Sequence, residues 1–306
     1  MHSIQGTTDL FLMPGDPVTN VRVPRMFNAV FDRFGIDAVF VPARVPVRDL
    51  AVFMKASFLA KNIRGMVIAP PHKPIVSSLL DGCGLLGRVA GSVNVVRRTE
   101  HGELEGDLFD GEGFTTALEY FNIPYRGKRV LILGAGVTGA AIGVALADGG
   151  TVDGPEHVAF FDPVAGKAAG LAAQLNAFFD ATIVAVDSND PAGYDLVVNA
   201  SQLGLGAEDA LPSDVSRMEP HAAVFDVLLR GQPTPFVRAA RARGLHAQPG
   251  FEMLLQQMPY YLDYFGYTEA AQGVRDDSQF LRDMIYPTAL AGEALNPPRY
   301  QSPSVA

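Results

Sequence analysis

The stretch VLILGAGVTGAAIGVALA, residues 130–147, places a short apolar run directly before a glycine-rich turn and an alanine-rich segment. This pattern predicts a buried strand, a tight turn and a helix. Gly134, Gly136 and Gly139 have the GxGxxG spacing, in which glycines let the backbone approach a dinucleotide's pyrophosphate and let the helix pack on the strand. The helix N-terminus adds partial positive charge and N–H donors. We therefore predict a dinucleotide-binding loop formed by Gly134, Ala135, Gly136, Val137, Thr138 and Gly139.

A second apolar run, HVAFF at residues 157–161, ends in Asp162. The distance from the glycines fits the acid that binds the adenosine ribose in such folds. A carboxylate there binds ribose hydroxyls and repels a 2′-phosphate, and Lys167 is the only cation close by. The segment therefore predicts NAD in preference to NADP, with NADP left open. The alternative is that Asp162 is an ordinary turn residue before Pro163.

Bulk properties restrict the class of protein. The chain has 306 residues, 48% apolar and 19% charged, which suits two soluble globular domains. A net charge of −9 argues against nucleic acid and anionic membrane as partners, but not against small anions. Cys83, the single cysteine, predicts neither a disulfide nor a metal site. Because no signal peptide or membrane-length apolar run is evident, we expect a cytoplasmic protein without a bound metal.

Apolar runs and amphipathic segments alternate along most of the chain, which predicts an α/β fold. We expect an N-terminal α/β domain over residues 1–114, completed by residues 251–295, and the family resemblance described below implies that it is the substrate-binding domain. A Rossmann domain with a doubly wound parallel sheet should occupy residues 115–250, and residues 296–306 should form a flexible tail. The expected strands are 11–15, 37–41, 65–69, 130–133, 157–161, 181–186, 196–199 and 222–227. The expected helices are 23–34, 47–62, 115–121 (after a break at 111–114), 167–178, 234–243 and 251–265.

Eight short segments, in one order, identify a family resemblance. They are GDPVTNVRVP (15–24), APPHK (69–73), GSVNVV (91–96), GDLFDGEGF (106–114), GAGVTG (134–139), NASQLGLG (199–206), FDVLLRGQPTP (225–235) and GFEMLLQQ (250–257). Together they resemble the shikimate and quinate dehydrogenases. The resemblance implies a catalytic domain and a Rossmann domain with the active site between them. It also implies reversible oxidation of a ring hydroxyl, with hydride passing to a nicotinamide. It leaves a homodimer open, because family members occur as monomers and dimers.

The resemblance assigns the proton chemistry to Lys73 and Asp110. The alcohol proton must leave as the hydride departs, and an amine can take it where the surroundings disfavour the charged form. A neighbouring carboxylate orients the amine. Seen singly, Lys73 would be a solvated surface lysine and Asp110 a helix cap or turn residue.

Further residues carry over to substrate and cofactor binding. Asn94 and Gln257 match family amides that bind substrate hydroxyls, since an amide offers both a donor and an acceptor. The alternatives are a turn residue and a polar helix face. Asn199 and Ser201 should lie near the nicotinamide, as should Met253, which could instead be an ordinary core residue.

The chain departs from the family pattern around the substrate. Val21 and Val23 replace two serines that hold the substrate carboxylate, and valine cannot donate a hydrogen bond. An unpaired carboxylate costs several kcal/mol, which lowers affinity by orders of magnitude. Ala69 replaces a threonine, Leu108 and Phe109 replace an asparagine and a threonine, and Leu229 replaces a tyrosine; Arg22 and Asn20 could offer new anion contacts.

These observations predict an NAD-dependent dehydrogenase acting on a secondary hydroxyl of a small, shikimate-like molecule other than shikimate. Three alternatives stay open. The first is a true shikimate or quinate dehydrogenase that holds the carboxylate with other residues. The second is a non-catalytic dinucleotide-binding regulatory protein, and the third is a relative that acts on a pterin or folate.

Overall fold

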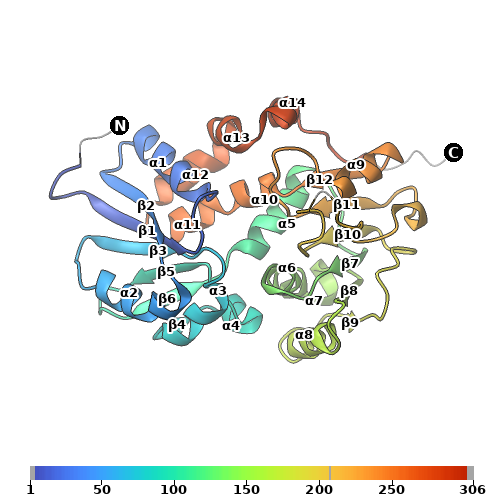
Figure 1. The fold of residues 1–306 in the computed structure, drawn as a ribbon, viewed down its shortest axis with the longest axis horizontal. Helices are drawn as coiled ribbons and strands as arrows, with labels where there is room; N and C mark the ends of the chain where they lie inside the picture. The colour runs from blue at the N-terminus through green and yellow to red at the C-terminus, as the bar shows by residue number, and fades with distance from the viewer. Residues whose placement is uncertain (1–3, 207, 302–306) are drawn as a thin grey trace. The chain divides into compact units, whose positions relative to one another are not determined.

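The computed structural model describes residues 4–206 and 208–301, and they divide into two compact units (Figure 1). Unit 1 comprises the chain up to Phe109 together with Gln257–Ile285, and unit 2 comprises Asp110–Gln256 and the chain from Tyr286 onward. The expected domain boundaries at residues 114, 251 and 295 differ from these limits, which fall at 109, 257 and 285. Helix α10 (Phe251–Gln256) packs along α5 (Asp110–Tyr120), which keeps both helices in unit 2.

Unit 1 contains a six-stranded sheet in the order β2–β1–β3–β5–β6–β4. Strand β1 pairs in parallel with β2 and β3, while β5 and β6 form an antiparallel hairpin that the sequence analysis did not predict. The three strands expected in this region are present, with shifted ends. The strand limits are β1 Asp9–Gly15, β2 Ala38–Arg44, β3 Ile63–Val67, β4 Gly82–Cys83, β5 Val95–Arg98 and β6 Leu104–Asp107.

Helices cover both faces of this sheet. Phe11 of β1 packs on Phe27 and Phe31 of α1. Its neighbours Leu10 and Leu12, which point to the other face, join a cluster with Leu50 and Met54 of α2. The helices of unit 1 are α1 Val23–Phe34, α2 Leu50–Ser57, α3 Lys73–Val76, α4 Leu85–Ala90, α11 Met258–Tyr264, α12 Thr268–Asp276 and α13 Gln279–Ile285.

Helix α1 confirms its prediction, and its ends explain why. Pro24 lies in the first turn, where a missing N–H costs nothing, and Gly35 ends the helix at φ 66°. The expected helix over residues 47–62 is wrong in extent. A 3-10 turn occupies Val47–Asp49, and the α-helix runs only from Leu50 to Ser57.

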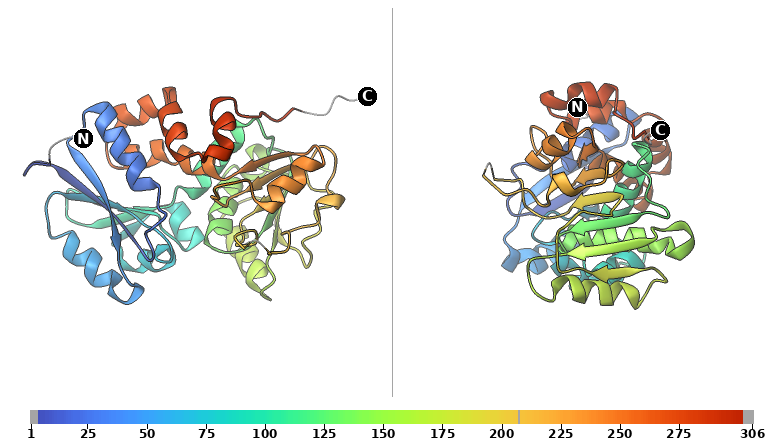
Figure 2. Two further views of the ribbon diagram at one scale, coloured as in Figure 1. Left: turned by 45° about the horizontal axis from the view of Figure 1, so that its top comes forward. Right: turned by 90° about the vertical axis from the view of Figure 1, so that its right-hand side faces the viewer.

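Unit 2 contains the predicted Rossmann sheet, which is parallel throughout (Figures 1 and 2). Its order β9–β8–β7–β10–β11–β12 corresponds to the doubly wound order 3-2-1-4-5-6, which reverses direction between β7 and β10. Strands β8 and β10 have the expected limits. The strand limits are β7 Arg129–Leu133, β8 His157–Phe161, β9 Ile183–Ala185, β10 Leu196–Asn199, β11 Ala223–Asp226 and β12 His246–Pro249.

Helix α5 corrects the expected break at residues 111–114, because the helix begins at Asp110 and includes those residues. A Cβ on Gly111 would lie 2.4 Å from the Ala141 carbonyl oxygen, so the glycine permits close packing of α5 on α6. The other helices of unit 2 are α6 Val137–Asp148, α7 Gly150–Asp153, α8 Lys167–Asn176, α9 Pro235–Ala242, α10 Phe251–Gln256 and α14 Ala291–Leu295.

Two expectations near the C-terminus are wrong. The single helix over residues 251–265 is divided at Gln257 into α10 and α11, because Pro259 occupies the first turn of α11. Residues 296–301 are not a free tail, since Tyr300 donates its N–H to Phe121 O and its hydroxyl to His221 O. The rest of the expected tail, residues 302–306, lies outside the described residues.

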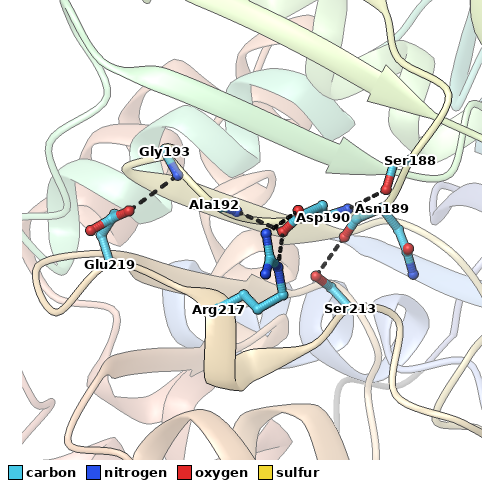
Figure 3. A network of polar contacts seen from close by, with 8 residues as sticks. All are labelled: Ser188, Asn189, Asp190, Ala192, Gly193, Ser213, Arg217 and Glu219. Atoms are coloured by element: carbon cyan, nitrogen blue, oxygen red, sulfur yellow. Dashed lines mark hydrogen bonds and ion pairs between the residues drawn. The ribbon is translucent and has the colours of Figure 1, made fainter.

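A polar network fixes the loop that leads into β10 (Figure 3). Arg217 donates to both carboxylate oxygens of Asp190, at 2.8 and 2.6 Å, and Glu219 accepts from the Gly193 N–H. The loop enters β10 at Leu196, and Asn199 ends that strand. The network therefore supports the end of β10 opposite to Asn199. Among the described helices of both units, none has the length and apolarity needed to cross a membrane.

Candidate active site

The glycine loop between β7 and α6 has the geometry of a dinucleotide cradle. Gly134 adopts φ 110° and donates its N–H to Phe161 O at 2.8 Å. A Cβ on Gly139 would lie 2.0 Å from Gly134 O, whereas a Cβ on Gly136 would meet only Lys167 Nζ, at 4.0 Å. Gly136 therefore borders open space at the start of α6. Val137 and Thr138 follow it in the first turn, partly exposed, so these residues fit a bound pyrophosphate.

Asp162 lies at the end of β8 and supports this loop. Its carboxylate accepts from the Ala135 N–H at 2.9 Å and the Val164 N–H at 3.0 Å, and it pairs with Lys167 at 3.1 Å. Burial alone would raise the pKa of Asp162, but these hydrogen bonds and the lysine lower it below the ordinary 3.8. The side chain is only 6% exposed, whereas that of Lys167 is 44% exposed. Asp162 therefore acts partly as the turn residue considered as an alternative, through Val164, and also supports the glycine loop, through Ala135.

Asn199 and Ser201 shape the loop after β10, next to the glycine loop. Asn199 is fully buried and accepts from the Ser201 N–H and hydroxyl. Its Nδ2 donates to Leu203 O and to the Asp226 carboxylate. A Cβ on Gly134 would lie 3.0 Å from the carbonyl carbon and oxygen of Ala200, so the two loops are in contact. Asn199 therefore holds the loop in place, while Ser201 is partly exposed.

Asp226 has a role in this loop that was not predicted from the sequence. This carboxylate is fully buried and accepts from the Thr234 hydroxyl at 2.6 Å, from Asn199 and from the Leu228 N–H. Burial raises the pKa of Asp226 from 3.8 to about 6, against the opposing effect of these hydrogen bonds. Asp226 and Thr234 lie in the motif FDVLLRGQPTP, so a signal was present. Met253 is also buried, in α10 of unit 2.

Within unit 1, backbone hydrogen bonds bring together three of the segments that carry predicted site residues. Lys73 is the first residue of α3, and its carbonyl accepts from the Val93 N–H at 3.0 Å. Asn94, which follows Val93 in the chain, donates its N–H to Asp107 O. The side-chain oxygen of Asn94 accepts from the Phe109 N–H. Asp110 follows directly as the first residue of α5, 7% exposed, where an acid suits the helix dipole.

Asn94 donates from Nδ2 to Gln257 Oε1 at 3.5 Å, and a residue that was not identified from the sequence joins the two amides more closely. Tyr261, one turn along the chain from Gln257, accepts from Asn94 Nδ2 at 2.9 Å and donates to Gln257 Oε1 at 2.7 Å. All three side chains are 4% exposed or less. The spacing of Gln257 and Tyr261 was the available signal, but tyrosine on an aromatic-rich helix is usually a core residue.

Val21, Val23 and Ala69, where the chain departs from the family pattern, are buried or half-buried in the structure. Val23 is the first residue of α1 and is 5% exposed, and Val21 is half-buried just before it. Ala69 is 1% exposed, and a Cβ on Gly15 would lie 2.7 Å from its Cβ. Arg22 lies between the valines, half-buried, and burial lowers its pKa.

A Rossmann sheet with a GxGxxG loop, together with a second α/β unit, is the architecture of a two-domain, dinucleotide-dependent enzyme. A family model described as the shikimate dehydrogenase substrate binding domain matches residues 13–96. The shikimate dehydrogenase (NADP(+)) of Rubrobacter xylanophilus is 36% identical over 258 residues, covering 83% of this chain and 89% of that protein. The chain belongs to the shikimate dehydrogenase family, as the sequence motifs indicated, and is an NAD(P)-dependent enzyme acting on CH–OH groups.

Solved structures agree with this assignment. The ligand-free 5-ketofructose reductase of Gluconobacter sp. strain CHM43 has a TM-score of 0.76 and 28% identity, covering 87% of this chain and 99% of its own. The quinate dehydrogenase of Corynebacterium glutamicum, in complex with NAD, has a TM-score of 0.76 and 26% identity, covering 87% and 98%. The family therefore includes chains named for different substrates.

Proposed function

We propose that this enzyme reversibly oxidises a secondary hydroxyl on a small polyhydroxylated molecule, and that shikimate is a poor substrate. The observation that carries this proposal is the contrast within unit 1. The polar residues Lys73, Asn94 and Gln257 are retained, while Val21 and Val23 offer no hydrogen-bond donor to a carboxylate. A substrate without a carboxylate loses nothing from the two valines.

In this proposal Lys73 and Asp110 handle the proton. The bound nicotinamide supplies the hydride acceptor for the C–H bond that breaks. The hydroxyl proton passes to the amine of Lys73, and the C–O single bond of the alcohol becomes the C=O double bond of a ketone. Asp110 orients that amine, and Gln257 holds an oxygen of the substrate. This proposal is supported by the hydrogen bond from the Val93 N–H to Lys73 O and by that from the Phe109 N–H to Asn94 Oδ1, since Val93 precedes Asn94 and Phe109 precedes Asp110 in the chain.

For the cofactor we propose NAD in preference to NADP. Asp162 keeps a carboxylate where a 2′-phosphate would need positive charge, and no arginine lies within the segment 160–170. The complex of the quinate dehydrogenase with NAD supports this preference. The Rubrobacter relative is named for NADP, so Lys167 beside Asp162 is the residue that could admit NADP here.

One of the similar solved structures supports the proposal that the substrate carries no carboxylate. The name 5-ketofructose denotes a keto sugar, which carries no carboxylate. The second candidate is a true shikimate or quinate dehydrogenase, which the names of the other relatives favour. In that case Arg22, half-buried between the valines, would hold the carboxylate.

The test supplies shikimate and quinate with NAD or NADP, and 5-ketofructose with either reduced cofactor, and follows the absorbance of the reduced nicotinamide. We expect the highest kcat/KM with the neutral keto sugar and with the NAD couple. Efficient turnover of shikimate would establish the second candidate instead. Arg22→Leu would then abolish that turnover, whereas under our proposal it leaves the keto-sugar rate unchanged.

A further inference from the structure

The hydrogen bonds around Tyr261 all run in one direction. The Phe109 backbone N–H can only donate, so its partner atom on Asn94 must be the oxygen, at 3.0 Å. Asn94 therefore turns its Nδ2 toward the Tyr261 hydroxyl, at 2.9 Å. Because that oxygen accepts from Asn94, the tyrosine's own proton goes to Gln257 Oε1, at 2.7 Å. A backbone N–H thus sets the orientation of three side chains.

The ring of Tyr261 is held rigidly by its neighbours. It packs edge-on against Phe109 with ring centroids 5.7 Å apart, and it lies 6.0 Å from Phe27 of α1. The residue is 2% exposed. Since a buried ring in contact on two sides cannot swing away, the hydroxyl stays between the two amides.

We infer that Tyr261 is a substrate-positioning residue, which fixes the Gln257 amide with its oxygen toward the tyrosine and its N–H groups toward a substrate oxygen. This inference rests on the proposed function, in which Gln257 holds the substrate. The site then selects an oxygen that accepts a hydrogen bond, such as a hydroxyl or ketone oxygen. Without the phenol, Gln257 Oε1 loses its 2.7 Å hydrogen bond and retains the longer one, at 3.5 Å, from Asn94 Nδ2. The amide is then held less firmly and can turn its carbonyl, which cannot bind an acceptor, toward the substrate.

Tyr261→Phe tests this role because it keeps the ring and removes the hydroxyl. Because a less firmly held amide binds the substrate oxygen more weakly, we expect KM for the substrate to rise about tenfold. We expect kcat to change less than about threefold, and KM for the cofactor to stay unchanged. The matched control is Tyr264→Phe, on the same helix and in the same aromatic cluster. The Tyr264 hydroxyl is buried and has no hydrogen-bond partner among the described residues, so its loss should leave KM unchanged.

A double-mutant cycle shows whether Tyr261 acts through Gln257. If it does, Tyr261→Phe has no further effect on KM in a Gln257→Leu background. Additive effects would overturn the inference, as would a Tyr261→Phe variant whose substrate KM equals that of the native enzyme. A general loss of folding is recognised from the thermal unfolding midpoint. In that event Asn94→Asp provides the second test, because it keeps the acceptor for Phe109 and draws the tyrosine proton away from Gln257. It should raise KM more in the native enzyme than in the Gln257→Leu background, and an equal rise in both would overturn the inference.

The substrate for these measurements is whichever of shikimate, quinate and 5-ketofructose the native enzyme turns over with the highest kcat/KM. Absence of turnover by the native enzyme with all three would contradict the proposed function. Turnover by the native enzyme that is insensitive to Tyr261→Phe would contradict only this inference. The two failures are therefore distinguishable.

Discussion

We expect two substitutions in the glycine loop, Gly136→Ala and Gly139→Ala, to differ in their effect on the free energy of unfolding. Gly136 adopts φ −85° and ψ −169°, which an alanine also adopts, and its new Cβ would meet only Lys167 Nζ at 4.0 Å. We therefore expect Gly136→Ala to change the free energy of unfolding by less than about 1 kcal/mol. The Cβ of Gly139→Ala would lie 2.0 Å from Gly134 O, so this variant should lose about 1–3 kcal/mol or more.

Cofactor binding should separate the two variants further. The methyl group of Gly136→Ala occupies the space through which a pyrophosphate approaches the backbone N–H groups. Loss of one or two hydrogen bonds to a charged group costs about 3 kcal/mol, which corresponds to a Kd about 100-fold weaker. The dissociation constant is measured by titration with reduced NAD, and the stability by thermal unfolding. A Gly136→Ala variant that binds the cofactor like the native enzyme, or that is destabilised as much as Gly139→Ala, would refute this prediction.

Three further predictions concern the substrate pocket, the cofactor and the pH dependence of stability. The double variant Val21→Ser/Val23→Ser should raise kcat/KM for shikimate by about tenfold or more, since each hydroxyl can donate to the carboxylate; an unchanged value argues against the role of the valines. Asp162→Asn removes the negative charge beside Lys167. The ratio of kcat/KM for NAD to that for NADP should therefore fall about tenfold, and a constant ratio would exclude Asp162 from cofactor selection. Asp226 should reduce stability as the pH rises, because its pKa is 3.8 when unfolded and about 6 when folded. Its stabilising contribution is complete below pH 3.8 and is lost as the pH passes about 6, a difference of about 3 kcal/mol. His246 acts in the opposite sense, because burial and Arg241 lower its pKa to about 4. The comparison is therefore native enzyme against Asp226→Asn in chemical denaturation at several pH values, and parallel curves would contradict the assignment.

The sequence predicted the fold best where one signal dominated. The strand HVAFF is a continuous apolar run. The helix over 23–34 has a clear amphipathic pattern, with Pro24 at its start and Gly35 at its end. The break expected at residues 111–114 lies instead inside α5, because the close packing of Gly111 on α6 outweighs the low helix propensity of glycine. Local pattern does not contain such tertiary contacts.

The candidate site shows the same division. The glycine loop could be predicted because the spacing of its glycines is enough to produce the tight turn and the close packing of helix on strand. Asp162 was predicted by position, but its hydrogen bonds to the loop depend on how β8 lies beside β7. Tyr261 was missed because its partners Asn94 and Gln257 are 163 residues apart in the chain. Only the folded unit brings them to one hydroxyl.

The central claim, that the side chain at residue 73 takes the proton of the reacting alcohol, is tested most directly by Lys73→Ala. A general base contributes about 100- to 10,000-fold, so kcat should fall by that factor. The Kd for NAD should be unchanged, because the dinucleotide loop belongs to the other unit. Lys61→Ala, which removes an exposed lysine of the same unit, is the control and should turn over like the native enzyme. Turnover by Lys73→Ala at the native rate would contradict the account.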